Sequence, residues 1–307
     1  MRNSIVRLLL GFLLLGIFQT CKQNAPAKVF TDTKSSGSAQ FVSDESFAPI
    51  LDQELYVFKN ENPDAKPSII YRSENEALKL LLDDSVRFAF LARDLNADEI
   101  KALKAHSLPA RAKKFAIDAI TIIVNEVSND TTISVGEIKK MLSGQTKTDK
   151  SIVFDNPNSS LVRYLKEFTG EKEFKQKNIY ALKSNKDVIE YVSKHPEAIG
   201  ITGFDWLNDP DADYADAVKK VKIVAVKDEN SKTAPNQYFK PSQTTLYLKQ
   251  YPLLRSLYIV NCTGREGLGT GFEYFIESER GQRIILRSGL LPVLIPHRDI
   301  VIHSDKL

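Results

Sequence analysis

The chain has 307 residues, of which 42% are hydrophobic and 26% are charged, and its formal net charge is +3. A chain of this length can form two domains with sizeable cores. So small a net charge excludes the broad basic surface that holds nucleic acid. Cys21 and Cys262 are the only cysteines, which excludes a disulfide framework and a cysteine-based metal site.

The first twenty residues have the pattern of an export signal. Arg2 and Arg7 precede an apolar run over residues 8–18, which gives an n-region followed by an h-region. The run has roughly half of the ~20 apolar residues that a membrane span requires. We therefore expect residues 1–20 to be a signal peptide. Its removal takes away two arginines and lowers the net charge from +3 to +1.

Cys21 directly follows the signal, at the position where bacterial lipoproteins are cleaved and acylated. Phe18 and Thr20 match the lipoprotein pattern in a relaxed form, and a plain secretory signal with an incidental cysteine is the alternative. Residues 21–38 are polar and predict a flexible tether after the lipidated cysteine. We expect an exported protein, lipid-anchored to a bacterial membrane and facing the periplasm or the cell surface. Cys262 lies in an apolar run and is expected to be a buried hydrophobe.

From residue 39 onward, strand-like and helix-like segments alternate, which predicts an α/β protein with largely parallel sheets. Apolar residues at helical spacing predict helices over 47–58, 161–168 and 272–276. Residues 205–216 contain five aspartates without the spacing of a calcium loop, so we expect a solvated surface loop there. The expected strands cover residues 39–43, 68–71, 86–91, 119–124, 151–154, 221–226 and 257–260.

Three junctions between a strand and a helix could hold a ligand. In open α/β sheets, ligands bind at the carboxyl ends of strands, where helix N-termini present free N–H groups. At the first junction, Ser43 or Asp44 can cap the helix that follows, and Ser46 can offer a hydroxyl. A helix cap without any ligand is the alternative at this junction.

The second junction carries Arg93 at the end of a strand, where a guanidinium can hold an oxyanion through two parallel hydrogen bonds. The alternative is a surface arginine paired with Asp94 or Asp98.

The third junction gives the strongest signal for an anion site. Asn158, Ser159 and Ser160 lead into an amphipathic helix, so hydroxyls and backbone N–H groups converge on one point. Arg163 lies one turn further along that helix.

Asp118 interrupts an otherwise apolar segment over residues 115–124. A carboxylate in a buried strand is unfavourable unless it finds donors. It either takes a backbone or arginine partner, or it accepts the proton of a monohydrogen oxyanion and thereby discriminates against fully ionised sulfate.

Motifs of catalysis are missing from the sequence. The four histidines have no metal-ligand spacing, and neither a Gly-x-Ser-x-Gly elbow nor a phosphate-binding P-loop is present. The glycine-rich segment 267–271 lacks the dinucleotide-binding spacing. We therefore expect a binding protein rather than an enzyme, with no catalytic residues, no cofactor, no metal and no nucleic-acid partner.

Four segments, in this order, resemble the phosphate-binding component of bacterial phosphate ABC importers, a PstS-like member of the type II periplasmic-binding-protein superfamily. The resemblance covers roughly residues 39–293. The first segment looks like the family's strand with a ligand-binding aspartate, and the others are similar to its "AIGY.G", "YPL.R.LY" and "GQ…G..P" patterns. These segments are AIDAITIIVN at 116–125, PEAIGITGF at 196–204, YPLLRSLY at 251–258, and Gly281-Gln282 with Gly289 and Pro292.

The resemblance implies two α/β lobes, each a mostly parallel sheet flanked by helices, joined by two hinge crossovers near residues 120–125 and 251–255. Lobe 1 would comprise residues 39–122 and 252–307, and lobe 2 residues 123–251. It also implies a monomer that captures phosphate or a related oxyanion between the lobes and delivers it to an ABC permease complex in the membrane.

The family's ligand residues carry over to Arg93, Asp118, Ser159 and Ser160, and less directly to Ser46. Three departures stand out: residues 43–46 replace a loop of small residues with two carboxylates, Ala92 replaces a serine, and the 158–160 segment lacks a glycine. Two alternatives follow. The first is a lipoprotein of the same fold with a degenerate cleft that acts as a surface interaction or sensor protein. The second, a two-lobed periplasmic enzyme, needs a nucleophile or metal that the sequence does not offer.

Overall fold

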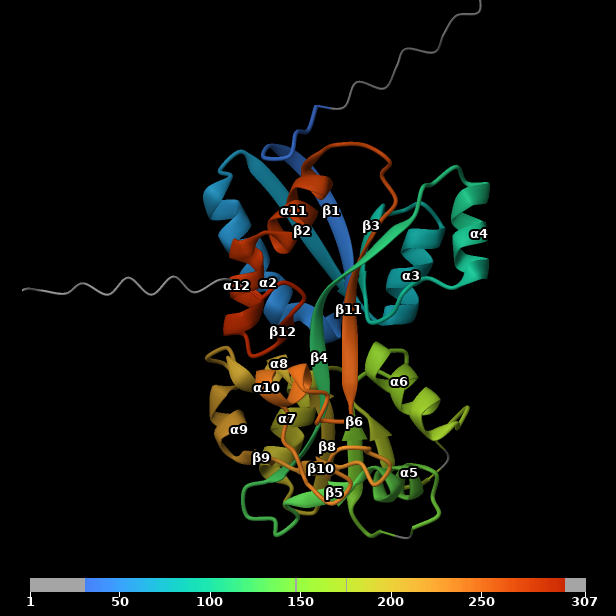
Figure 1. Ribbon diagram of the computed structural model, residues 1–307, viewed down its shortest axis with the longest axis vertical. Helices are drawn as coiled ribbons and strands as arrows, with labels where there is room; N and C mark the ends of the chain where they lie inside the picture. The colour runs from blue at the N-terminus through green and yellow to red at the C-terminus, as the bar shows by residue number, and fades with distance from the viewer. Residues whose placement is uncertain (1–30, 147, 175, 296–307) are drawn as a thin grey trace, which may run out of the picture. The chain divides into compact units, whose positions relative to one another are not determined.

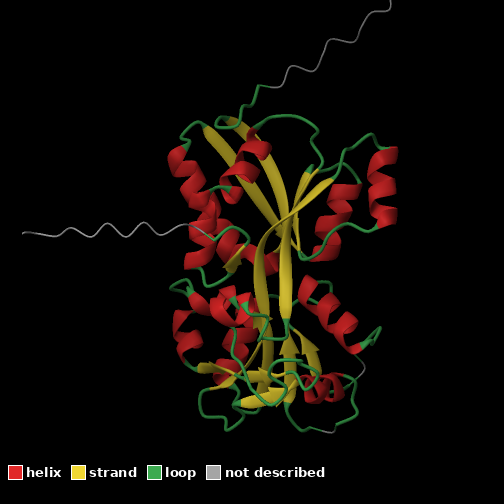
Figure 2. Ribbon diagram, in the orientation of Figure 1, coloured by secondary structure: helices red, strands yellow, loops and turns green. Residues whose placement is uncertain are grey.

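The computed structural model describes residues 31–146, 148–174 and 176–295. Its main sheet has ten strands, and two long strands connect the parts of the sheet (Figure 1). These are β4 (Arg111–Asn125) and β11 (Leu254–Asn261), which pair with each other in antiparallel fashion. They divide the molecule into two lobes, each with its own strands and helices (Figure 2). Cys21 and the expected signal peptide lie outside the described residues.

Lobe 1 is built from both ends of the described chain. Strand β1 lies parallel to β2 and β3, β3 pairs antiparallel with β11, and β12 pairs with β4. Its further elements are η2 (Glu45–Phe47), α2 (Ala48–Glu61), α3 (Glu74–Leu82), α4 (Ala97–Ala105), α11 (Leu268–Glu277) and α12 (Glu279–Arg287). The strands are β1 (Gly37–Asp44), β2 (Ala65–Arg72), β3 (Phe88–Leu91) and β12 (Leu291–Pro292).

Lobe 2 continues from the far end of β4. Strands β8 and β9 pair antiparallel with β4, while β6 lies parallel to β8 and β7 parallel to β6; β5 and β10 form a separate two-stranded parallel sheet. The strands are β5 (Thr132–Ser134), β6 (Ser151–Phe154), β7 (Ile179–Ala181), β8 (Ala198–Gly203), β9 (Val221–Ile223) and β10 (Ala225–Lys227). The helices are α5 (Val135–Leu142), α6 (Ser160–Thr169), α7 (Asn185–Lys194), α8 (Asp205–Asn208), α9 (Ala215–Lys219) and α10 (Gln243–Tyr247).

The alternation of strands and helices predicted from the sequence is confirmed. The sequence did not predict strands β5, β7, β8 and β12, and three of its other expectations differ from the structure. Strand β4 begins at Arg111, whereas the sequence predicted a strand from residue 119. The polar first half of β4 pairs with β11, and this pairing outweighs the low strand propensity of that segment. The expected strand 221–226 is divided into β9 and β10, which join different sheets. The expected solvated loop 205–216 instead contains α8, in which Asp205 and Trp206 are buried.

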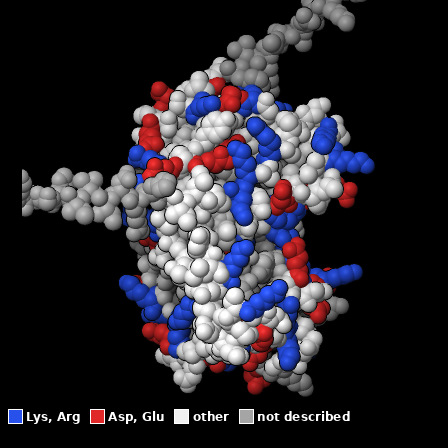
Figure 3. Space-filling model, viewed as in Figure 1, with Lys and Arg blue, Asp and Glu red and all other residues white. Residues whose placement is uncertain are grey.

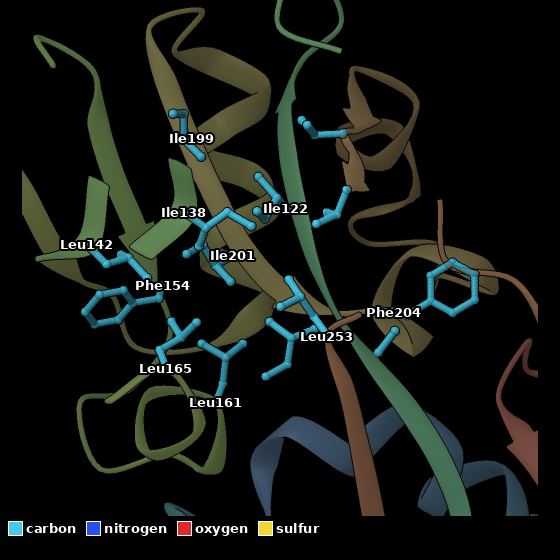
Figure 4. Packing of buried hydrophobic residues seen from close by; sticks show 14 of the residues in the cluster. Ile122, Ile138, Leu142, Phe154, Leu161, Leu165, Ile199, Ile201, Phe204 and Leu253 are labelled. Atoms are coloured by element: carbon cyan, nitrogen blue, oxygen red, sulfur yellow. The ribbon is translucent and has the colours of Figure 1, made fainter. Parts of the chain in front are cut away.

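Apolar side chains cover both faces of the sheet in each lobe. In lobe 1, α2, α11 and α12 pack on one face and α3 and α4 on the other, as the two separate core clusters show (Figure 1). In lobe 2, α5 and α6 place Ile138, Leu142 and Leu161 against Ile122 of β4 and Ile201 of β8 (Figure 4). Full burial of one such side chain stabilises the fold by about 1.5–3 kcal/mol.

Charged side chains lie mainly outside these cores. On the face shown in Figure 3, basic and acidic residues are interspersed, as the near-neutral composition predicts.

Cys262 is fully buried and free, as expected. Asp32 forms an ion pair with Arg265 and accepts a hydrogen bond from the Leu268 N–H, so contacts with lobe 1 begin within the expected tether. The division of the lobes at residues 122 and 251 stays a prediction.

Gly200 allows α7 to pack closely on β8, which gives a test of this core. An added Cβ would lie 2.7 Å from Val192 Cγ2 and 2.8 Å from Ile123 Cγ1. We expect Gly200→Ala to lower the free energy of unfolding by about 1–3 kcal/mol in urea denaturation. The control is Gly136→Ala, whose Cβ would meet only the mobile end of Glu229 and which favours helix α5. Equal stability of the two variants would contradict this packing.

Candidate ligand-binding site

Polar side chains from both lobes gather where β1, β6 and β8 end, beside the junction of β4 and β11. In lobe 1, β1 ends at Asp44; in lobe 2, β6 is followed by Asp155 and β8 ends at Gly203. Helix α6 begins next to this point, with Ser159 as its N-cap. The carboxyl ends of strands and a helix N-terminus are where α/β proteins bind ligands.

Asp44 links the two lobes through its carboxylate. One oxygen, Oδ1, accepts a hydrogen bond from the Ser46 N–H at 3.0 Å, and Oδ2 accepts one from the Ser160 N–H at 2.7 Å. The side chain is almost completely buried. Burial, and then the nearby Glu74 carboxylate, raise the pKa of Asp44, while the Ser160 hydrogen bond opposes this shift. Ser43 is also buried, and its hydroxyl donates to the Asp44 carbonyl oxygen.

Asp155 is the centre of a second group of hydrogen bonds. It accepts from the Ser159 hydroxyl at 2.5 Å, from the Ser46 hydroxyl at 3.1 Å and from the Asn185 side-chain amide at 3.1 Å. Ser46 comes from lobe 1, so this group also joins the lobes. Burial, followed by the Asp44 charge, raises the pKa of Asp155 to about 7. Burial and the Asp155 charge raise the pKa of neighbouring Glu45 to about 8.

Arg255 and Asp118 form a buried ion pair beside these carboxylates. Arg255 Nη2 lies 2.5 Å from Asp118 Oδ2, and Nη1 donates to the Ser160 hydroxyl at 3.0 Å. The guanidinium also lies over the ring of Phe47, 4.9 Å from its centre. The second oxygen of Asp118 accepts from the Phe204 N–H. Asp118 therefore has the arginine and backbone partners that its sequence position requires.

Two groups in this cluster have unused hydrogen-bonding capacity. The two carboxylate oxygens of Asp205 and the Nε of Arg255 are buried, and none of these atoms has a hydrogen-bond partner of good geometry among the described residues. The Trp206 backbone N–H lies near enough to Asp205 to lower its pKa, but burial outweighs this effect. Burial, and then the neighbouring Asp118 charge, raise the pKa of Asp205 well above its usual value. A Cβ added at Gly203 would lie 3.0 Å from Asp205 Oδ1 and 3.0 Å from Arg255 Nη2, so these groups pack closely around Gly203 and a side chain there would press against them.

The remaining predicted residues lie further out and have other partners. Arg93 pairs with Glu99, at 2.7 Å, rather than with the Asp94 or Asp98 side chains. Arg163 pairs with Glu74 of lobe 1 and with Glu167 of its own helix. Asn158 is exposed, and its carbonyl oxygen accepts from the Asn75 N–H of lobe 1 at 3.4 Å.

The structure therefore brings Ser43, Asp44, Ser46, Asp118, Ser159 and Ser160 together and places Arg93, Asn158 and Arg163 around them. Sequence reasoning assigned no ligand role to Asp155, Arg255 or Asp205. Each of the three had a signal in the sequence. Asp155 and Asp205 closely follow buried strands. Arg255 is two residues before Leu257 and four before Ile259, so in a strand its side chain lies on the same buried face as theirs.

Carboxylates outnumber cations at this site. Four acidic side chains interact with the buried guanidinium of Arg255: Asp44, Asp118, Asp155 and Asp205. Glu45 adds a fifth carboxyl group beside Asp155. Among residues 31–295, apart from 147 and 175, no group of His, Cys, Asp or Glu has the arrangement of a metal site. The raised pKa values of Asp155 and Glu45 show how so many carboxyl groups coexist, because protonated carboxyl groups do not repel one another.

Comparison with known proteins identifies the class to which this fold belongs. The sequence model of the protein family described as the PBP superfamily domain matches residues 22–280, and the chain belongs to this family. None of the curated protein sequences matched significantly. No helix in the described part of the chain is long and apolar enough to cross a membrane.

Solved structures show the same two-lobed fold. A substrate-binding protein from Clostridium perfringens, solved with bound phosphate, is 20% identical, with a TM-score of 0.69 over 84% of this chain and 100% of its own. An ABC-type phosphate transport receptor from Vibrio cholerae is 17% identical, with a TM-score of 0.61 over 82% and 99%. PstS from Borrelia burgdorferi is 22% identical, with a TM-score of 0.51 over 84% and 99%. The resemblance drawn from the sequence motifs is confirmed, and these likenesses establish the fold.

The raised pKa values make folding stability depend on pH. Asp155 and Glu45 hold protons in the folded state up to pH 7–8, whereas in the unfolded chain they release them near pH 4. Their contribution to stability is complete below about pH 4 and is lost as the pH rises, by about 1.4 kcal/mol per pH unit for each group. We expect urea denaturation to show falling stability between pH 5 and 7, and Asp155→Asn to reduce the slope. An unchanged slope in that variant, with Asp216→Asn as the exposed control, would contradict the raised pKa.

Proposed function

We propose that this chain is an exported, lipid-anchored solute-binding protein that captures a small oxyanion and delivers it to an ABC permease. Phosphate is the oxyanion that we propose it prefers. The fold and the family support the solute-binding role. The position of the polar cluster supports a ligand that touches both lobes, and such a ligand stabilises the form in which the lobes are together. All of the proposed contacts come from one chain, so a monomer suffices.

The observation that carries this proposal is the pair of unpartnered groups beside Gly203. Arg255 Nε is a buried donor without an acceptor, and Asp205 is a buried acceptor without a donor. A protonated oxyanion satisfies both, because one of its oxygens accepts from the guanidinium and its own proton goes toward the carboxylate. Fully ionised sulfate lacks that proton, so it could bind here only with Asp205 protonated, whereas a protonated oxyanion also suits the ionised carboxylate. In this proposal Asp205 performs the selection that the sequence suggested for Asp118.

The opposite side of the site offers hydroxyls and a helix N-terminus. Ser46, Ser159 and Ser160 are all buried, and the last two begin helix α6. The Ser46 and Ser159 hydroxyls donate to Asp155, whereas the Ser160 hydroxyl accepts from Arg255 and keeps its own proton for an anion. The N-terminus of the helix adds a favourable partial charge. Arg93 and Arg163 lie at the edge of the site, where each is paired with a glutamate and balances its charge.

The first test is calorimetric titration of residues 22–307, refolded to remove carried-over ligand, with phosphate, arsenate and sulfate. We expect saturable binding of phosphate and arsenate without binding of sulfate. Asp205→Asn removes the carboxyl group that shares the ligand proton, and it should weaken phosphate binding about tenfold or more. Asp216→Asn is the exposed control. A wild-type protein that binds none of the three anions would refute the oxyanion proposal and favour the interaction or sensor alternative.

The proposed anchor is tested separately. Expressed in full length in a bacterium, the protein should incorporate a labelled fatty acid and sediment with membranes, because acyl chains partition into the bilayer. Cys21→Ser should abolish the label and release the protein from the membrane fraction. Export of an unlabelled wild-type protein would instead support a plain secretory signal.

A further inference from the structure

The Asp44 carboxylate lies where an anion would bind to helix α6. Its Oδ2 accepts from the Ser160 N–H at 2.7 Å, at the start of a ten-residue helix whose N-cap is Ser159. Asp44 is 116 residues away in the sequence and belongs to the opposite lobe. A free N–H at a helix N-terminus is a ready position for an oxyanion oxygen, and here it is already occupied by a side chain.

Two N–H groups hold the Asp44 carboxyl group in place although most of the charged groups around it are acidic. Four charged groups face its carboxylate from the elements packed around it: Glu45 in η2, Glu74 in α3, Asp155 after β6 and Arg255 in β11. Three of the four are acidic. The contact is therefore maintained by the Ser160 and Ser46 N–H groups and by Arg255, which are the kinds of donor that an oxyanion also uses.

Neighbouring hydrogen bonds extend this contact into a lobe-to-lobe connection. Ser46 donates to Asp155, and Trp206 Nε1 donates to the Ser46 carbonyl oxygen at 3.0 Å. Arg163 pairs with Glu74 across the same boundary. Through these contacts the protein's own groups hold lobe 1 and lobe 2 together.

We propose that Asp44 is a specificity-determining residue that acts as a tethered anion: its carboxylate occupies the oxyanion position at α6, and an incoming solute must displace it. The proposal rests on the oxyanion function proposed above. The attached carboxylate competes at a high effective concentration, because it needs no diffusion to reach the N–H group. Only an anion that makes further contacts, such as those with Arg255 and Asp205, replaces it. Asp44 thus sets a threshold that rejects weakly bound anions.

The test compares Asp44→Ser, which empties the position, with Asp44→Asn, which keeps an acceptor but removes the charge. We expect Asp44→Ser to strengthen phosphate binding about tenfold or more in calorimetry at constant pH, and Asp44→Asn to have a smaller effect. Asp216→Ser, at an exposed position of α9, is the matched control. Unchanged or weaker phosphate binding by a folded Asp44→Ser variant would overturn the proposal, because Asp44 would then not compete with the anion.

A second measurement separates this proposal from the oxyanion function itself. The chain has one tryptophan, Trp206, and its indole contacts Ser46 across the lobes, so its fluorescence reports their separation. Without any ligand, Asp44→Ser should shift the Trp206 emission toward that of an exposed indole, whereas Asp216→Ser should not. Absence of phosphate binding in every variant would refute the oxyanion function alone. An unshifted emission in ligand-free Asp44→Ser would refute the tethered anion.

Discussion

The buried ion pair between Arg255 and Asp118 is the interaction on which the arrangement of the site depends. The two residues face each other across the antiparallel strands β11 and β4, the strands that run from one lobe to the other. Removing one partner of such a pair typically costs about 3–5 kcal/mol, because the other charge stays buried and unpaired. The same guanidinium donates to Ser160, so the pair that fixes the strand crossing also positions the start of helix α6.

Around this pair, the site is an acidic cluster that is stable because its acids are not all ionised. Burial raises the pKa of Asp44, Glu45, Asp155 and Asp205, and their donors come from both lobes. A polar network of this kind is favourable only when nearly every member is satisfied. Asp205 and the Arg255 Nε are the exceptions in this network, and the proposed anion would satisfy both. The proposed anion and the proposed competition by Asp44 both follow from this balance.

Much of the fold could be predicted from the sequence, because burial in strands and helices leaves a periodic pattern. The serines before α6 and Asp118 within β4 stood out for the same reason: each breaks or ends an apolar segment. Arg93 was visible too, but its partner Glu99 was not, since Glu99 also caps helix α4 and its side chain reaches back to the strand end. Asp205 was misread because it is the first of five aspartates in a short segment, which suggested a solvent-exposed loop. In the structure Asp205 begins helix α8 and its side chain is buried.

The sequence by itself determined the α/β alternation, the family and the ends of strands at which polar residues gather. Only the tertiary structure decided which of those residues meet. Asp44 and Ser160 are 116 positions apart, and Asp118 and Arg255 are 137 positions apart. Periodicity records whether a side chain is buried, but it carries no information about which distant side chain lies opposite. That choice depends on strand order and on how the lobes face each other, and it turned an expected anion site into one that a carboxylate already fills.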